Sequence, residues 1–547
     1  MKRGNKTRRD FLKTLGLGVA SMSLPGFLGT AEQTVTKPNI ILIMADDLGY
    51  SDIGCYGGEI RTPNLDALAA GGMRFTQFYN CAKCSPTRAT LLTGQYDQAV
   101  GVSKMEHGGT FAEILRPAGY RTIISGKWHQ KPLPTTRGFD RYYGLADGCC
   151  NYWNPGIKAR PGEPAPGRKR AEPRRWAIEG KAIMGYTPQD KNFYTTDAFA
   201  DYAIARLDEY KNEIKPFLLY LPLTAPHYPL HAWPEDIARY RGKYKIGWDE
   251  LRRQRYKRQI EMGMFDPKYE MSPRDERVQS WDSLSDSEKD QADLKMAVYA
   301  AMIDRMDQDI GRVFAKVKEI GKWDNTLILF LSDNGGCAET PDTTPTIPPG
   351  PVESYRALGP PWANASNTPY RKYKSTDYEG GNHTPFIAYW PGVIKQGTIT
   401  GQVGHIIDIM PTFMEVAGAE YPDRIGNRKL KPLAGKSLLP VFQGKQREPH
   451  QVLYWQYGKA KAVRTGNWKL VKYGNADWEL YDLEKDRTEL KNLASQHPEK
   501  VKQMAGMWEN WWEKCRSKKF TDISVSANDE ICPPHYHLIL RAKLVIS

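Results

Sequence analysis

The sequence predicts an α/β fold in which a large mixed, mostly parallel β-sheet lies between layers of helices. Short apolar runs end abruptly in polar residues, which is typical of strands that are buried on both faces. Amphipathic segments with a repeat near 3.6 residues separate these runs, and strands that alternate with helices form parallel sheets. Because 547 residues are many for one compact core, we expect two domains.

Five apolar runs are the predicted strands of this sheet. They cover residues 39–44, 121–125, 216–221, 327–331 and 385–390. The first four lead into polar motifs that contain, in order, Asp46 and Asp47, Lys127 and His129, His227, and Asp333 and Asn334. Ligands of such sheets bind beyond the carboxyl ends of the strands, so these motifs predict one active site at a single sheet edge.

The predicted helices cover residues 194–210, 293–320 and 406–418. Gly418 fits a C-cap of the last helix. Residues 155–190 are rich in Pro, Gly, Arg and Lys and predict a surface loop, whereas the strongly charged residues 239–289 predict an exposed helical insertion. Residues 340–362 form a proline-rich loop that is close to the polar motifs in sequence.

The character of the sequence changes near residue 446. Short apolar segments at residues 452–455, 462–464, 468–472 and 479–481 alternate with Gly, Asn and Asp turns, and a helical pattern at 498–514 follows. We therefore expect a catalytic domain over residues 36–445 and a smaller C-terminal domain over residues 446–547.

The most specific pattern in the chain is CSPTR at residues 84–88, followed by ATLLTG. It matches Cys-x-Pro-x-Arg, an element in which an enzyme oxidises the cysteine to Cα-formylglycine. Other motifs accompany it, namely DD at 46–47, GKWH at 126–129, APH at 225–227, SDNG at 332–335, and Lys374 before EGG at 379–381. On these residues, over about 37–395, the chain resembles the type I, formylglycine-dependent sulfatases and is arylsulfatase-like.

This resemblance implies a fold and a reaction. The fold would be alkaline-phosphatase-like, with a small C-terminal antiparallel sheet and a helix packed on it. The reaction would be hydrolysis of sulfate monoesters (aryl or carbohydrate sulfates) to an alcohol plus sulfate. Its intermediate would be a covalent sulfate on a formylglycine hydrate. A phosphonate monoester or phosphodiester hydrolase is the alternative enzyme. A non-catalytic binder of sulfated glycans is the alternative outside enzymes, although such a binder is expected to have lost a motif residue.

The resemblance also implies catalytic roles. Cys84, once converted, is the nucleophile, and Arg88, one turn further along a helix that starts near Pro86, stabilises the hydrate. Lys127 and Lys374 bind the sulfate oxygens, where negative charge develops.

Two histidines complete the implied catalytic set. His129 is the base for elimination of sulfate, and His227 is the acid that protonates the leaving oxygen. A structural role is the alternative for each of them. The chain departs from the family after EGG, where it has Asn382 and His383 instead of a common arginine, and this puts any ion pair at that place in doubt.

Oxygen ligands at two predicted strand ends indicate a metal site. The ligands would be three carboxylates and one amide, from Asp46, Asp47, Asp333 and Asn334. Three carboxylates held close together would repel one another unless a divalent cation neutralised them. The resemblance adds the converted Cys84 as a ligand. An all-oxygen set favours Ca²⁺, with Mg²⁺ next, because Zn²⁺ prefers His or Cys. Capped turns are the alternative interpretation of both motifs.

The N-terminus has the pattern of an export signal. Residues 7–13 (TRRDFLK) contain a twin arginine, residues 14–28 are mildly apolar, and residues 29–31 are small. We therefore predict a signal peptide over residues 1–31 and a bacterial periplasmic or extracellular location. Partners would be the twin-arginine machinery, which exports folded proteins, and a formylglycine-generating enzyme that acts on Cys84 beforehand.

Charge and cysteine content leave two points open. The formal net charge is +14, of which residues 1–31 contribute +5 through six Lys/Arg and one acid, so +9 remains. This surplus fits either a solvated surface or attraction of sulfated substrates, and no nucleic-acid-binding pattern accompanies it. Cys515 and Cys532 would form a disulfide only in an oxidising compartment. Tyr152, Trp153, His231 and Trp233 fit either a sugar site or the core.

Overall fold

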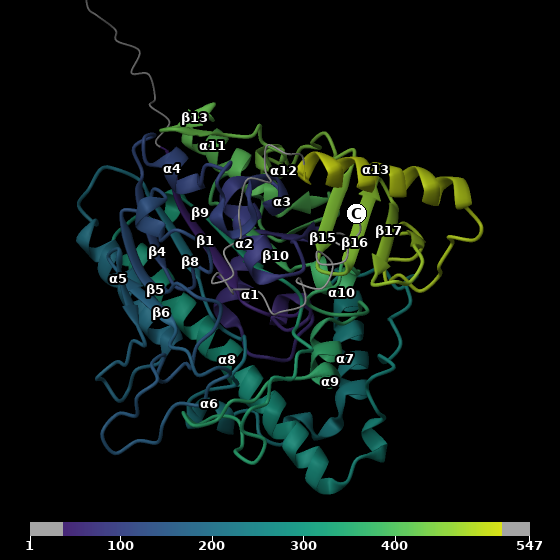
Figure 1. The fold of residues 1–547 in the computed structure, drawn as a ribbon, viewed down its shortest axis with the longest axis horizontal. Coiled ribbons are helices and arrows are strands. Elements are labelled where there is room, and N and C mark those ends of the chain that lie inside the picture. The colour runs from purple at the N-terminus through teal and green to yellow at the C-terminus, as the bar shows by residue number, and fades with distance from the viewer. Residues whose placement is uncertain (1–36, 517–547) are drawn as a thin grey trace, which may run out of the picture. The chain divides into compact units, whose positions relative to one another are not determined.

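A computed structural model describes residues 37–516 (Figure 1). The predicted signal peptide at residues 1–31 and Cys532 therefore lie outside the described residues. The largest element is a ten-stranded sheet with the order β11-β2-β10-β9-β1-β8-β4-β5-β6-β7. Its strands are β1 (Asn39–Ala45), β2 (Met73–Phe75), β4 (Arg121–Ser125), β5 (Arg141–Leu145), β6 (Arg175–Ile178), β7 (Lys181–Met184), β8 (Phe217–Pro222), β9 (Thr326–Ser332), β10 (Phe386–Tyr389) and β11 (Thr398–Thr400).

The sheet is mixed, and its centre is parallel. Strands β9, β1, β8, β4 and β5 pair in parallel, so their carboxyl ends meet at one edge. Strand β10 pairs antiparallel with β9 and β2, and β6 and β7 add an antiparallel hairpin at the other end. The five predicted strands are all present, and the predicted α/β architecture is confirmed.

The hairpin β6–β7 corrects the prediction of a loop over residues 155–190. Arg175–Ile178 joins the sheet because Trp176 is fully buried, where it packs against Tyr143 and Phe199. A strand of four residues that carries two charged neighbours gives little periodic signal, so composition alone favoured a loop here.

Alternating residues of β1 face two separate cores. Ile41 and Ile43 pack with α1 (Pro63–Gly71), α5 (Thr195–Glu209) and α8 (Asp286–Glu319). Ile40 and Leu42 pack with α2 (Cys84–Thr93), α4 (Phe111–Leu115) and α11 (Ile409–Ala417). The central strands are therefore covered by helices on both faces, as their continuous apolar runs predicted.

Shorter elements connect these layers. They are β3 (Phe78–Tyr79), α3 (Asp97–Val100), α6 (Pro234–Ala238), α7 (Trp248–Glu261), α9 (Pro360–Ser366), α10 (Glu379–Asn382), β12 (Gly404–His405), β13 (Arg424–Ile425), β14 (Arg428–Lys429) and α12 (Leu439–Phe442). Helix α7 lies in the predicted exposed insertion, but its Arg255 is fully buried and forms ion pairs with Asp52 and Glu59. The expectation of a solvated charged helix was therefore wrong on this side of α7.

A second, four-stranded antiparallel sheet follows, as predicted. Strands β15 (Leu453–Tyr457), β16 (Ala460–Thr465), β17 (Trp468–Tyr473) and β18 (Glu479–Asp482) pair in sequence order. Helix α13 (Pro498–Arg516) packs on one face of this sheet through Met504 and Trp508. The other face packs against Tyr79, Tyr96 and Tyr378 of the main part. The domain division near residue 446 remains a prediction.

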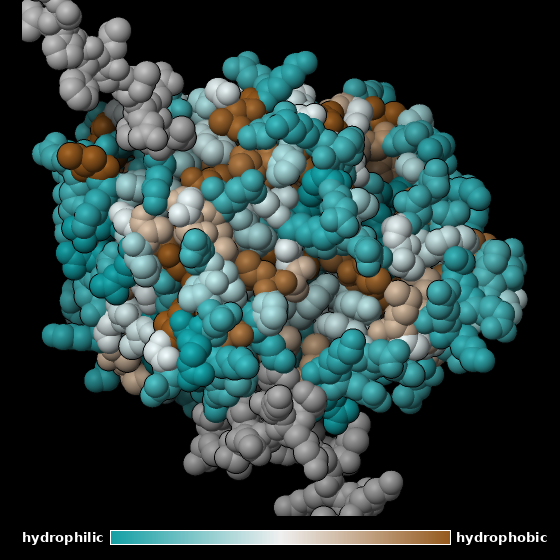
Figure 2. Space-filling model, turned by 90° about the horizontal axis from the view of Figure 1, so that it is seen from above, coloured by the Kyte–Doolittle hydropathy of each residue, from teal (hydrophilic) through white to brown (hydrophobic). Residues whose placement is uncertain are grey.

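Hydrophilic residues dominate the face that Figure 2 shows, and hydrophobic residues appear there in small groups. Among residues 37–516, none of the helices combines the length and the apolar character that a bilayer crossing requires.

Candidate active site

Two neighbouring strands bring the acidic motifs together. Strands β1 and β9 are adjacent and parallel, with Ala45 opposite Ser332, so Asp46 and Asp47 follow one strand where Asp333 and Asn334 follow the other. The backbone N–H of Asp47 donates to Asp333 Oδ1 at 3.2 Å, and Asn334 Nδ2 donates to Asp47 Oδ1 at 2.7 Å. The four predicted metal ligands thus form one contiguous group, and all are buried.

Three buried cations neutralise these carboxylates one by one. Lys127 Nζ lies 2.5 Å from Asp46 Oδ2, and Arg88 Nη2 lies 2.7 Å from Asp333 Oδ2. Lys374 Nζ lies 2.6 Å from Asp47 Oδ1.

This pairing is what permits the burial, because an isolated buried charge costs several kcal/mol. We call these three cations, the three carboxylates and Asn334 the strand-end cluster. Burial, reinforced by the neighbouring Asp333, raises the pKa of Asp46 to about 8. Burial lowers the pKa of Lys374, but Asp47 outweighs it and holds that pKa well above its ordinary value.

Helix α2 presents the cysteine motif to this cluster. Cys84 is the first residue of the helix and only 5% exposed, and Arg88 follows one turn later. Arg88 joins the helix to the cluster, because its Nη2 lies 2.7 Å from Asp333 Oδ2. Cys81 has a separate, structural environment, since its thiol donates to Thr90 Oγ1.

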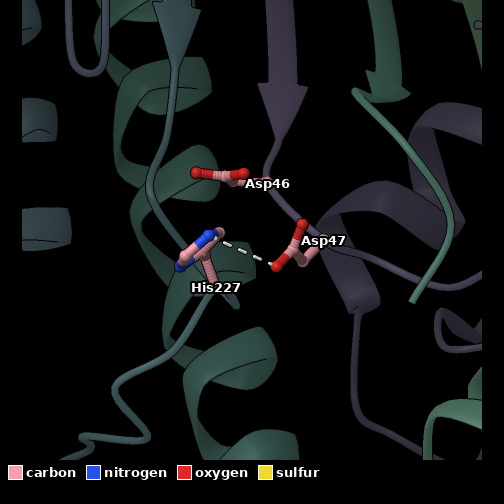
Figure 3. Close-up of side chains that lie close together, drawn as sticks. All are labelled: Asp46, Asp47 and His227. Atoms are coloured by element: carbon pink, nitrogen blue, oxygen red, sulfur yellow. Dashed lines mark ion pairs between the residues drawn. The ribbon is translucent and has the colours of Figure 1, made fainter. Parts of the chain in front are cut away.

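His227 joins the carboxylates from the end of β8. Its Nε2 lies 3.5 Å from Asp47 Oδ2, and its Nδ1 lies 2.6 Å from the carbonyl oxygen of Tyr228 (Figure 3). Asp46, Asp47 and His227 offer ligand atoms that all lie within 4.8 Å of one another. Burial, together with the nearby Lys374, lowers the pKa of His227 well below its ordinary value. The neutral imidazole beside the carboxylates is therefore also placed to bind a metal, which the sequence did not indicate.

His129 follows the end of β4 and makes fewer hydrogen bonds than His227. Within the described part of the chain, its buried Nδ1 has no hydrogen-bond partner. Burial and the charge of Lys127 lower its pKa well below the ordinary value.

Left-handed backbone conformations also mark the site. Asp47, His129 and Ser375 have φ values of 67°, 54° and 70°. Such conformations are unfavourable for non-glycine residues and concentrate at functional sites.

The strand-end cluster fits a divalent cation. Asp46 Oδ1 and Asn334 Oδ1 are buried and have no hydrogen-bond partner among the described residues. Buried oxygens are normally satisfied, so two orphaned ones beside three carboxylates fit the coordination of a cation. Carboxylate and amide oxygens are ligands that Ca²⁺ and Mg²⁺ prefer.

A second buried charge cluster lies behind the EGG motif. Glu379 Oε1 accepts a hydrogen bond from Lys469 Nζ at 2.7 Å, and its Oε2 accepts one from Tyr79 at 2.9 Å. His383 Nδ1 lies 3.1 Å from Glu379 Oε2, and Lys469 also pairs with Glu489. Burial lowers the pKa of His383 to about 4, so its contact with Glu379 is a hydrogen bond of a neutral imidazole, and Lys469 of β17 supplies the cation that pairs with Glu379. We call these five residues the Glu379 cluster.

The core interpretation holds for most of the candidate sugar-site aromatics. Tyr152 and Trp153 are 1% and 9% exposed, and His231 is fully buried. Both ring nitrogens of His231 are engaged, Nδ1 by the N–H of Tyr152 and Nε2 by the carbonyl of Ser354.

Comparison with known proteins identifies the family. A family model described as Sulfatase matches residues 38–419, and one described as the C-terminal part of N-sulphoglucosamine sulphohydrolase matches residues 372–516. An arylsulfatase of Klebsiella aerogenes is 33% identical over 461 residues, which cover 78% of this chain and 96% of that protein. An uncharacterized sulfatase of Schizosaccharomyces pombe is 34% identical over 528 residues, which cover 86% and 93%.

A solved structure agrees in fold. Ps i-CgsB in complex with k-i-k-neocarrahexaose superposes with a TM-score of 0.63 at 26% identity, and the match covers 87% of this chain and 93% of that one. The fold is the alkaline-phosphatase-like one that the motifs predicted. The chain therefore belongs to the sulfatase family and is a sulfuric ester hydrolase.

Proposed function

We propose that this sulfatase hydrolyses carbohydrate sulfates at the strand-end cluster, with Cys84 converted to formylglycine and one Ca²⁺ bound. The observation that carries the proposal is the pair of orphaned oxygens, Asp46 Oδ1 and Asn334 Oδ1, among three buried carboxylates. Asp46, Asp47, Asp333 and Asn334 would hold the cation together with the converted residue 84. When bound, these groups supply a hydrated aldehyde as the nucleophile and a positive charge that favours its ionisation.

Charge balance explains how the lysines become available to substrate. Without a metal, Lys127 forms an ion pair with Asp46, and Lys374 forms one with Asp47. With a divalent cation held by these carboxylates, Lys127 and Lys374 would be free to bind the sulfate oxygens. Arg88 keeps its contact with Asp333 and holds the ligand in place. This exchange places positive charge where the transition state becomes more negative.

The histidines divide the proton transfers. His227 is neutral, and its Nδ1 points at a carbonyl oxygen, so Nδ1 carries the proton and Nε2 faces Asp47. In the substrate complex, we propose that Nε2 first takes up a proton from solvent and then transfers it to the leaving oxygen, so that His227 acts as the acid. His129, whose Nδ1 has no partner among the described residues, is assigned the base that drives release of sulfate.

Names of relatives support a carbohydrate substrate. Ps i-CgsB was solved with neocarrahexaose, and another relative, of Canis lupus familiaris, is an N-acetylgalactosamine-6-sulfatase that is 26% identical over 487 residues. Export by the twin-arginine machinery after action of a formylglycine-generating enzyme belongs to the same proposal, since the folded site buries Cys84.

The test compares matched aryl esters. The enzyme should hydrolyse 4-nitrophenyl sulfate faster than 4-nitrophenyl phosphate or a 4-nitrophenyl phosphonate. The peptide with residue 84 should be about 18 Da lighter than its thiol form, as oxidation to the aldehyde requires. Faster phosphonate hydrolysis would favour the alternative enzyme class, and full activity with an unmodified thiol would exclude Cys84 as the precursor of the nucleophile.

A further inference from the structure

A basic hollow lies beside the strand-end cluster. Its enclosed volume is only about 20 Å³, so it is a shallow, solvent-open recess in the surface and not a deep pocket. Arg168, Lys169, Arg170 and Arg174 line it together with a single acid, Glu172. These residues come from the Pro-, Gly- and Arg-rich segment that none of the proposed catalytic roles uses.

The hollow adjoins both catalytic histidines. Cys149 lines the hollow, and the residue before it, Gly148, lies against His129. A Cβ atom added to Gly148 would be only 2.8 Å from His129 Nε2. Lys169 Nζ lies 3.3 Å from the hydroxyl of Tyr228, and the Tyr228 ring lies 4.1 Å from that of His227. The basic residues thus begin where the leaving group would emerge from the acid His227.

Among residues 37–516, none of these four cations forms an ion pair with a carboxylate. Arg174 contacts Cys149 Sγ at 3.7 Å, and Arg168 donates to the carbonyl of Ala171. The exposed Arg170 has no side-chain partner among residues 37–516. In contrast, exposed arginines of the 239–289 segment pair with carboxylates, as Arg253 does with Glu250 at 2.7 Å.

We propose that this hollow binds a second anionic group, a sulfate or carboxylate, on the alcohol part of the substrate. The inference rests on the proposed function, because the position of the leaving group follows from His227. Four cations around one acid attract anions and would repel a neutral or cationic neighbour. A solvated basic surface is the competing explanation, and it predicts that these four cations bind a multiply charged anion no better than exposed cations elsewhere on the chain. The substrate class is therefore a multiply charged sulfated glycan.

The experiment measures binding of two probes by calorimetry to the intact, metal-loaded enzyme. Sucrose octasulfate presents many anionic groups, and inorganic sulfate presents one. The double variant Lys169→Met/Arg170→Met removes two exposed charges of the hollow. The control Lys459→Met/Lys491→Met removes two exposed charges near the C-terminal sheet.

Wild-type enzyme should bind sucrose octasulfate more tightly than sulfate. The hollow variant should bind the octasulfate about tenfold more weakly, since each exposed ion pair contributes a small factor, while its affinity for sulfate changes much less. The control should retain both affinities. Equal effects of the two double variants, or no preference of the wild type for the octasulfate, would overturn the inference. Failure of the proposed function would appear separately, as absence of 4-nitrophenyl sulfate hydrolysis by the wild type.

Discussion

The strand-end cluster and the Glu379 cluster are built from the same chemistry and differ in whether the oxygens at their centre have hydrogen-bond partners. Both bury carboxylates beside lysines and arrange them with hydrogen bonds. Both oxygens of Glu379 accept hydrogen bonds, whereas Asp46 Oδ1 and Asn334 Oδ1 have no partner in the described part of the protein.

Hydrogen bonds to both oxygens of Glu379 stabilise the fold and leave that carboxylate little capacity for a ligand, although His383 Nε2 in the same cluster has no partner among the described residues. Orphaned oxygens carry an energetic cost that protonation or a bound cation can remove. The difference indicates that burial of charge alone does not identify a functional site, and that orphaned oxygens gathered beside several carboxylates are the more specific sign.

Removal of the metal should give the largest effect and should act only on the strand-end cluster. Chelation is expected to abolish turnover, and Ca²⁺ should restore it better than Mg²⁺. Asp333→Ala should behave like the chelated enzyme, with a loss of at least about 10³-fold in initial rate, because a metal and its charge supply several kcal/mol to such reactions. Glu379→Gln should keep its metal dependence. Full activity of metal-free protein would show that the cluster is structural.

The Glu379 cluster should respond in stability instead. Lys469→Met leaves Glu379 and Glu489 buried without their cation, so the free energy of unfolding should fall by ~3–5 kcal/mol. Denaturant unfolding followed by tryptophan fluorescence measures this loss. Lys472→Met, in the same strand β17 but only half-buried, is the matched control and should cost less than ~1 kcal/mol. Equal losses would mean that the buried pair contributes no more than a surface charge.

Leaving-group dependence separates the two histidines. His227→Ala should slow hydrolysis of a sugar sulfate by about 10²–10³-fold but that of 4-nitrophenyl sulfate far less, because an activated phenol needs little protonation. His129→Ala should slow both substrates alike, since its proposed step follows departure of the alcohol. Steady-state rates for the four combinations give the answer. The same ratio between substrates for both variants would contradict this division of roles.

The sequence predicted the sheet and most of the site because both follow from local patterns. Continuous apolar runs such as residues 39–44 require burial on both faces, and parallel pairing then brings Asp46 and Asp333 to one edge. It did not predict Lys469 as the partner of Glu379, since the two are 90 residues apart and no motif links them. Nor did it predict that His227 offers a possible ligand atom within 4.8 Å of those of Asp46 and Asp47, because that depends on side-chain packing after β8.

A buried carboxylate outside both clusters gives the smallest predicted effect and extends the comparison to pH. Asp377 is 1% exposed, and neither of its oxygens has a hydrogen-bond partner among the described residues. Burial raises its pKa from 3.8 to about 8. The folded state therefore binds the extra proton between these two values, and the stability contribution of Asp377 is complete below pH 3.8 and is lost as the pH rises towards 8.

Asp377→Asn cannot titrate, so it should be more stable than wild type by ~1–3 kcal/mol at pH 8, given the cost of a buried unpaired group, and this gain should shrink towards pH 4. Asp408 is the matched control, because Arg447 and His450 overcome the effect of burial and hold its pKa well below its ordinary value. Asp408→Asn should lose stability at neutral pH, and the loss should diminish as the pH falls below about 4. Unfolding free energies of the three proteins between pH 2 and pH 8 provide the measurement. Parallel pH profiles for the two variants would contradict the prediction. They would show that the hydrogen-bond partners of a buried carboxylate do not decide whether Asp→Asn raises or lowers the free energy of unfolding.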